Sequence, residues 1–155
     1  MKSHNKSTLI ISILIPLAVG SLSAFLSGNN SSIYSSLNKP AFSPPPFLFS
    51  IVWTILYILM GISSYIIYIS NSPNKSTALK IYALQLFFNF WWSIIFFRFS
   101  QYLFAFIWLL VLILLIIIMI KKFYSIRPVS AYLQIPYLIW CIPAAYLNYS
   151  IYIMN

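Results

Sequence analysis

The sequence predicts an all-α integral membrane protein, a single domain over residues 1–155 that forms a bundle of five transmembrane helices. Hydrophobic residues make up 62% of the chain and charged residues only 6%, too few charges to cover the surface of a soluble domain of this size. Apolar runs long enough to cross a bilayer as helices recur along the chain. A transmembrane β-barrel is excluded because its strands alternate in polarity, whereas residues 111–120 are apolar throughout.

The charged residues exclude several function classes. The chain has nine Lys and Arg residues and no Asp or Glu, so it has no carboxylate for acid/base catalysis, for a hard cation or for a proton relay. We expect no metal site and no cofactor, because His4 lies in a polar tail and Cys141 is the single cysteine. The basic residues are scattered at the ends of apolar runs, a pattern of membrane topology that argues against nucleic-acid binding.

The first predicted helix covers residues 9–26 and follows a polar tail that contains Lys2 and Lys6. A basic start and small residues near its end also fit a signal peptide, although no Ala-x-Ala cleavage site follows. Gly20 and Ala24 form a small-xxx-small pair, which indicates close packing against another helix.

Residues 28–46 form the longest polar connection and end in three consecutive prolines. Asn and Gly open a turn, and the prolines fix an extended approach to the next helix. The segment is longer and stiffer than a simple connector requires. It is either a lid over the mouth of the bundle or an ordinary surface loop.

The second predicted helix covers residues 47–69, and Pro46 suits its first turn. Trp53 and Tyr57 are four residues apart and therefore share one face. The default interpretation of such an aromatic stripe is core packing.

The third predicted helix covers residues 78–97 and contains Gln85 and Asn89 on one face. Amides are costly in lipid, so we expect both side chains to point into the bundle. There they bond either to other helices or to a ligand.

The fourth predicted helix covers residues 102–120, and its central part has no polar side chain, which suits lipid contact. Basic residues and Pro128 follow, and the fifth predicted helix covers residues 129–153. On this last helix the spacing places Trp140, Ala144 and Asn148 on one face, together with Pro136, Leu147 and Ile151. A large aromatic beside small residues and an amide fits either a pocket for a flat ligand or a helix packing face.

Five spans place the two termini on opposite sides of the membrane. One side carries Lys39 and Arg98, and the other carries Lys2, Lys6, Lys75, Lys80, Lys121, Lys122 and Arg127. Because Lys and Arg are enriched in cytoplasmic segments, we predict a multi-pass cell-membrane protein with a cytoplasmic N-terminus. The Pro-rich loop and the C-terminus then lie outside.

Four groups of residues form an ordered set over residues 34–155. They are KPAFSPP at 39–45; VWTILY at 52–57 with Met60-Gly61; Gln85-Leu86 with Asn89, Trp92 and Phe96-Phe97; and Pro136-Tyr137-Leu138 with Trp140, Leu147 and Asn148. In this order they resemble the TspO/MBR family of translocator proteins, tryptophan-rich sensory proteins and peripheral-type benzodiazepine receptors. Each motif is weak alone, and the ordered set is specific.

The resemblance implies a five-helix bundle, often a homodimer, with a cavity under the first loop for porphyrins, cholesterol-like lipids and drug ligands. By matching position, the ligand-binding residues would be Phe42, Trp53, Asn89, Trp92, Trp140, Ala144, Leu147 and Asn148. In the family, the tryptophans matching Trp53 and Trp140 are linked to light-dependent breakdown of protoporphyrin, so these two would be the catalytic candidates. No conventional enzyme is implied.

The chain departs from the family pattern at two places. Phe42 stands where the family usually has Trp, which keeps a stacking surface but removes the indole N–H. The sterol motif of the animal proteins needs a basic residue after its Tyr, and none follows Tyr149. Porphyrin propionates would need cations, for which Lys39 and Arg98 are the candidates on the loop side; both also suit interfacial anchoring.

Three functions are compatible with these observations. The first is a membrane receptor or sensor that binds a porphyrin or another hydrophobic molecule. The alternative is a transporter of porphyrin, lipid or sterol, against which the chain shows no inverted repeat and no acid for ion coupling. The third is a structural or stress-response membrane protein that binds no ligand. Beyond the ligand and membrane lipid, a second copy of the chain is the expected partner.

Overall fold

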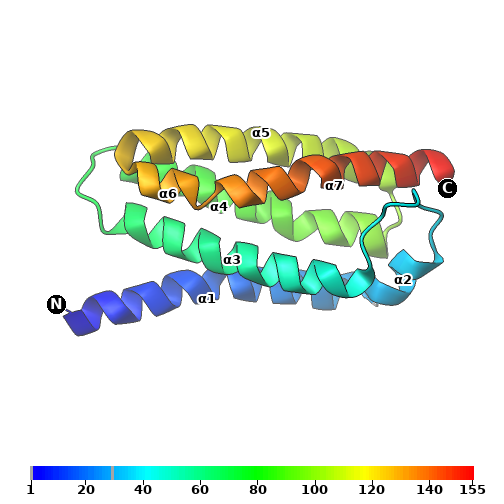
Figure 1. Ribbon diagram of the computed structural model, residues 1–155. Coiled ribbons are helices and arrows are strands. Elements are labelled where there is room, and N and C mark those ends of the chain that lie inside the picture. Colours follow the sequence, from blue (N-terminus) through cyan, green and yellow to red (C-terminus); the bar gives the residue numbers. More distant parts are fainter. Residues whose placement is uncertain (1, 29) are drawn as a thin grey trace.

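The computed structural model describes residues 2–28 and 30–155, with side chains from residue 6 onward in these ranges. It is all-helical, and five helical segments are long and apolar enough to cross a membrane (Figure 1). They are α1 (Lys2–Ser27), α3 (Pro46–Tyr68), α4 (Lys75–Ser93) with the π-helical turn η1 (Ile94–Arg98), α5 (Tyr102–Ile126), and α6 (Pro128–Tyr132) followed by α7 (Ile135–Met154). The predicted all-α bundle of five spans is confirmed.

The connection after α1 contains a helix that the sequence did not indicate, α2 (Asn30–Ser36). Its Tyr34 is buried, and the Tyr34 hydroxyl donates a hydrogen bond of 2.8 Å to the carbonyl of Pro44. Lys39 Nζ donates to the carbonyls of Tyr34 and Leu37, at 2.9 and 3.2 Å. These contacts fold the segment onto itself at the end of the bundle where the C-terminus lies (Figure 1).

Two helix boundaries differ from the prediction. Helix α5 continues to Ile126, six residues beyond the expected end at Ile120, so Lys121 and Lys122 belong to its last turns. The last span is divided at residues 133–134, because Pro136 has no N–H to donate to the carbonyl of Tyr132 and its ring clashes there. The chain tightens instead, with the Gln134 N–H donating to the carbonyl of Ala131 at 3.0 Å.

Helices α1 and α3 run side by side at close distance (Figure 1). A Cβ atom on Gly61 would lie 2.4 Å from Cα of Ile13, and one on Gly20 would lie 2.2 Å from the ring of Tyr57. The approach at Gly61 is to backbone and requires a residue without a side chain, whereas at Gly20 the ring of Tyr57 would have to move. The first helix, which also fitted a signal peptide, is therefore a packed member of the bundle.

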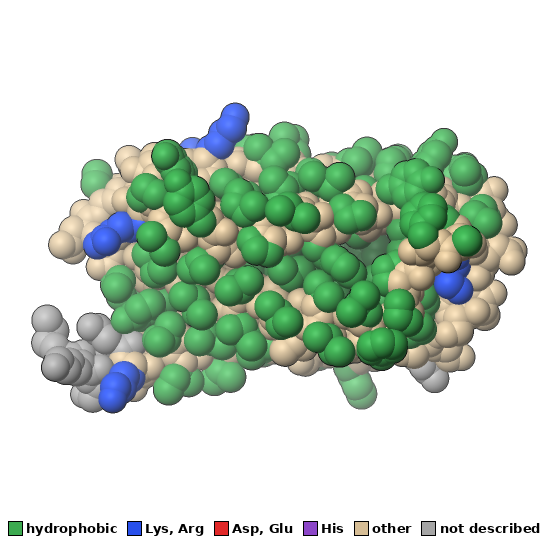
Figure 2. Space-filling view, in the orientation of Figure 1, with side chains coloured by type: hydrophobic (Ala, Val, Ile, Leu, Met, Phe, Trp, Pro, Cys, Tyr) green, Lys and Arg blue, Asp and Glu red, His purple; other side chains and the backbone are tan. Residues whose placement is uncertain are grey.

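The connections group at two ends of the bundle as five spans require. The N-terminus shares one end with the α3–α4 and α5–α6 connections, and the C-terminus shares the other with the segment around α2 (Figure 1). Between the ends the visible face is mostly hydrophobic, and the basic side chains lie toward the ends (Figure 2). Such a surface suits an integral membrane protein.

Candidate ligand-binding cavity

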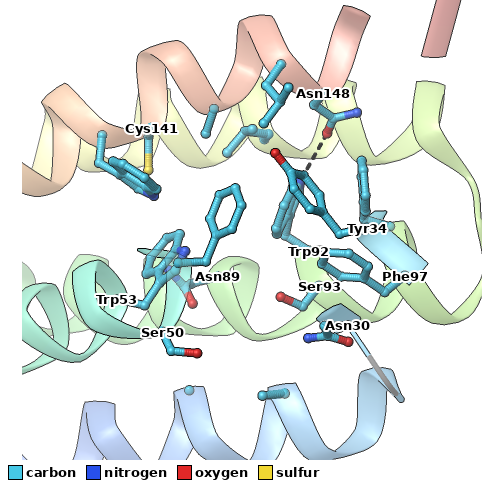
Figure 3. Close-up of a pocket in the computed structure, with 18 of the residues that line it drawn as sticks. Asn30, Tyr34, Ser50, Trp53, Asn89, Trp92, Ser93, Phe97, Cys141 and Asn148 are labelled. Atoms are coloured by element: carbon cyan, nitrogen blue, oxygen red, sulfur yellow. Dashed lines mark hydrogen bonds between the residues drawn. The ribbon is translucent and has the colours of Figure 1, made fainter. Parts of the chain in front are cut away.

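A cavity with a volume of about 180 Å³ lies within the half of the bundle next to α2. Its walls come from α1, α2, α3, α4, η1, α5 and α7 (Figure 3). The lining is mostly apolar and aromatic, with a few amides and hydroxyls, and none of the described residues that line it is charged. This composition is typical of a site for a hydrophobic small molecule.

The structure brings together seven of the eight residues expected at the site. Trp53, Asn89, Trp92, Trp140, Ala144, Leu147 and Asn148 all line the cavity. Phe42 does not line it: its side chain is 69% exposed and stacks on Tyr146, with ring centroids 5.8 Å apart. Phe42 lies in the turn after α2, and the buried aromatic of this segment is Tyr34, so a role of Phe42 in ligand binding stays a prediction.

Several lining residues were not expected from the sequence, including Tyr34, Phe49 and Phe97. Phe49 and Trp140 meet edge to face at 5.8 Å between centroids, and Tyr34 meets Phe49 in the same way at 5.0 Å. The signal for Phe49 was available, since it lies four residues before Trp53 on the same helix face. Tyr34 gave no such signal, because its burial depends on the fold of the α2 segment.

The π-helical turn η1 shapes one side of the cavity. It contributes Phe96 and Phe97 to the lining, and Phe96 stacks on Trp92 with ring centroids 5.2 Å apart. Single π-helical turns inside α-helices often occur at functional sites.

Asn148 is buried and is held by two other helices. Its Oδ1 accepts a hydrogen bond of 3.0 Å from Nε1 of Trp92 (Figure 3). Its Nδ2 donates one of 2.9 Å to the carbonyl of Tyr102. It joins α7 to α4 and to the first residue of α5. This amide therefore holds the cavity wall in place in addition to lining it.

Asn89 belongs to a second buried network. Its Oδ1 accepts from the hydroxyl of Tyr57 at 2.7 Å, and its Nδ2 donates to the hydroxyl of Tyr137 at 2.8 Å. The Tyr137 hydroxyl donates in turn to Oε1 of Gln85 at 2.7 Å. Both amides of the third span thus point into the bundle as predicted, and both are bonded to other helices.

The indole of Trp140 differs from these amides because its Nε1 is buried and has no hydrogen-bond partner. Asn30 Oδ1, on α2, is likewise buried without a partner. An indole N–H can only donate, and an unsatisfied buried donor costs about 1–3 kcal/mol. A ligand with an acceptor atom would remove this cost at Trp140.

The two cations proposed for propionate binding lie outside the lining. Lys39 donates to the backbone of its own loop, with its Nζ 4.7 Å from the ring centroid of Tyr34. Arg98 donates to the carbonyl of Leu26 at 3.1 Å. Both fit the alternative interpretation of anchors at the end of the bundle.

The profile of the TspO/MBR family matches residues 12–154 of this chain. The chain belongs to the TspO/MBR family. It is 36% identical to the tryptophan-rich protein TspO of Archaeoglobus fulgidus over 148 residues, which cover 95% of this chain and 96% of that protein. It is 33% identical to the translocator protein of Ovis aries over 143 residues, covering 90% and 85% of the two chains. The resemblance of the sequence motifs to the TspO/MBR family is thus confirmed. The protein is a multi-pass integral membrane protein.

Proposed function

We propose that this protein is a membrane receptor or sensor that binds a flat hydrophobic ligand, such as a porphyrin, in the cavity beside α2. The observation that supports this most directly is the buried, unpartnered indole N–H of Trp140 in a wall of an aromatic cavity. It provides one directed hydrogen bond within a surface suited to stacking. The neighbouring amides, Asn89 and Asn148, are already bonded to other helices.

The uncharged lining limits how a porphyrin would bind. Because no charged side chain among the described lining residues can pair with a propionate, the macrocycle would enter the cavity and the carboxylates would stay outside it. Burying an unpaired carboxylate is far more costly than burying a ring. A porphyrin dimethyl ester should therefore bind at least as tightly as the free diacid.

The light-dependent reaction remains part of the proposal, and it would need only Trp53 or Trp140 next to the ring. A photoexcited porphyrin would take one electron from the indole, giving a porphyrin radical anion and an indole radical cation. Dissolved dioxygen would then accept that electron as superoxide. The indole radical cation would regain an electron from the neutral porphyrin, and superoxide would add to the resulting porphyrin radical cation, so that the net reaction is the addition of one dioxygen to the macrocycle and the indole is restored. The protein would supply proximity and exclude bulk water.

The test is a titration of purified, detergent-solubilised protein with protoporphyrin dimethyl ester in the dark, followed by tryptophan fluorescence. We expect saturable quenching and roughly tenfold weaker binding for Trp140→Phe, which loses one hydrogen bond of about 1.4 kcal/mol. Trp91→Phe is the matched control because it also removes one indole but lies outside the cavity lining. Linear quenching, or equal affinities in both variants, would contradict the proposal.

Illumination of the same samples tests the chemical step. Loss of porphyrin absorbance should require dioxygen and should disappear in the double variant Trp53→Phe, Trp140→Phe. Transport, the alternative function, predicts instead that porphyrin crosses the membrane of sealed vesicles at a rate that depends on the protein. Saturable binding without flux would favour the receptor.

A further inference from the structure

A second cavity lies in the other half of the bundle, away from α2. It has a volume of about 260 Å³ on the same measure and shares no lining residue with the cavity described above. It is formed by α1, α3 and α4, and its lining residues are Ser12, Ile15, Ser64, Tyr68, Leu79, Tyr82, Ala83 and Leu86. Ile15 and Tyr68 are about half exposed, so this groove opens on the surface that faces lipid.

The groove has few polar groups, and most of them are already bonded. The Ser12 hydroxyl donates to the carbonyl of Thr8 at 2.8 Å, and the Ser64 hydroxyl donates to the carbonyl of Gly61 at 3.0 Å. The exception is Tyr82, which is only 7% exposed and whose hydroxyl lies beside the Ser64 hydroxyl but makes no hydrogen bond of normal geometry. The groove therefore suits an apolar chain that carries an acceptor near one end.

One end of the groove carries a positive charge. Lys75 Nζ lies 5.4 Å from the ring centroid of Tyr68, which lines the groove. Lys75, Leu79 and Tyr82 follow one another at helical spacing, so they share a face of α4. Tyr82 lies about 10 Å further along the helix axis than Lys75, at 1.5 Å per residue.

The charge of Lys75 has no acidic partner in the protein. Its Nζ donates to the carbonyls of Tyr68 and Ser70, at 2.9 and 3.1 Å, which leaves one of its three N–H groups. The chain contains no Asp or Glu, so no side-chain carboxylate can serve as counterion. Basic sites between transmembrane helices commonly recruit anionic lipid headgroups.

We propose that this groove binds an anionic glycerophospholipid, with one acyl chain between α1 and α4 and the phosphate against Lys75. The Tyr82 hydroxyl, deeper along the same face, would donate to an ester carbonyl. Such a lipid stabilises the folded protein by an amount that grows with the logarithm of its free concentration above the dissociation constant, because the groove exists only when α1, α3 and α4 are packed.

The test compares the thermal unfolding midpoint of the purified protein in neutral detergent during titration with phosphatidylglycerol and with phosphatidylcholine. We expect a midpoint that rises with the logarithm of the anionic lipid concentration, and about fivefold weaker binding for Lys75→Gln, the effect of one basic residue at a lipid headgroup. Lys121→Gln is the matched control, because it removes an exposed charge from α5, away from the groove. It should bind as the unaltered protein does.

A second variant tests the groove itself. Ala83 is an exposed lining residue, so Ala83→Phe should fill the groove and weaken both lipids without changing the charge. Equal midpoint shifts with both lipids, or an unchanged shift in Lys75→Gln, would contradict recognition of an anionic headgroup. An unchanged shift in Ala83→Phe would contradict binding in this groove. Self-association that Ala83→Phe abolishes would assign the groove to a second copy of the chain and would also overturn the proposal.

Discussion

Asn148 and Trp140 lie on the same face of α7 but differ in what they do before any ligand binds. Asn148 makes two hydrogen bonds to other helices, whereas the Trp140 N–H makes none. Removing the Asn148 amide should lower the stability of the fold, whereas removing the Trp140 N–H should lower only the affinity for a ligand. From the sequence, either residue could have belonged to a ligand pocket or to a helix packing face, and the structure separates their roles.

We predict that Asn148→Ala lowers the free energy of unfolding by about 1–3 kcal/mol, since two interhelical bonds are lost. The indole N–H of Trp92 would also be left without its acceptor. The measurement is the thermal unfolding midpoint in detergent, with Trp140→Phe as the comparison variant. A midpoint for Asn148→Ala equal to that of Trp140→Phe would contradict this role.

The individual cavity residues could be predicted mainly because their types and order resemble one family. Their bonding partners could not, because Trp92 and Tyr102 lie 56 and 46 residues before Asn148 in the chain. Sequence spacing determines which side chains share a helix face, but it contains no information about which helices face one another. Phe42 was expected at the site from its matching position in the family, and its stacking on Tyr146 of α7 could not be predicted from spacing along the chain.

At the scale of elements, the five spans could be predicted from their apolar length, but their irregular parts were not predicted. The break at residues 133–134 had a signal in Pro136, which the single predicted span 129–153 did not use. The π-helical turn Ile94–Arg98 has no distinctive composition. Helix α2 consists largely of Asn and Ser, residues that favour turns when considered alone. Tertiary contacts through Tyr34 override that preference.

The contact between α1 and α3 gives a prediction at this scale. Gly61→Ala should destabilise the bundle by about 1–3 kcal/mol through overpacking, because the added methyl group meets the backbone of Ile13, which cannot rotate away. The lower midpoint should be visible by thermal unfolding in detergent. Ile55→Ala, on the exposed face of α3, is the control and should change the midpoint less. If the unfolding midpoint of Gly61→Ala equals that of the unaltered protein, the close contact between α1 and α3 does not contribute to stability.

For the whole molecule, the grouping of the helix ends leads to a prediction of orientation in the membrane. The side with the α3–α4 connection carries most of the basic residues, so we expect it in the cytoplasm. In a Cys141→Ala background, Ser36→Cys on α2 should react with an impermeant thiol reagent applied to intact cells. Asn74→Cys, exposed between α3 and α4, should react only after the membrane is opened. The reverse labelling pattern would show that the α3–α4 connection lies outside the cell and would contradict the predicted orientation.

The uncharged lining of the cavity next to α2 leads to the last prediction, which concerns the pH dependence of ligand binding. The titratable side chains among its described lining residues are Tyr34, Tyr57 and Cys141, and such groups ordinarily titrate above about pH 8. Burial raises the pKa of Tyr34 further, which keeps it neutral. Binding of a neutral ligand should therefore stay constant between about pH 5.5 and 7.5.

The measurement is the dissociation constant of protoporphyrin dimethyl ester across that range, with free protoporphyrin as the comparison because its own carboxylates titrate. Constant affinity for the ester, together with tighter binding of the diacid as its carboxylates become protonated at lower pH, would follow from a cavity without cations. A change in the affinity for the ester that follows a single protonation step would contradict the prediction. It would mean that a titrating side chain outside the described cavity lining contacts the bound ligand.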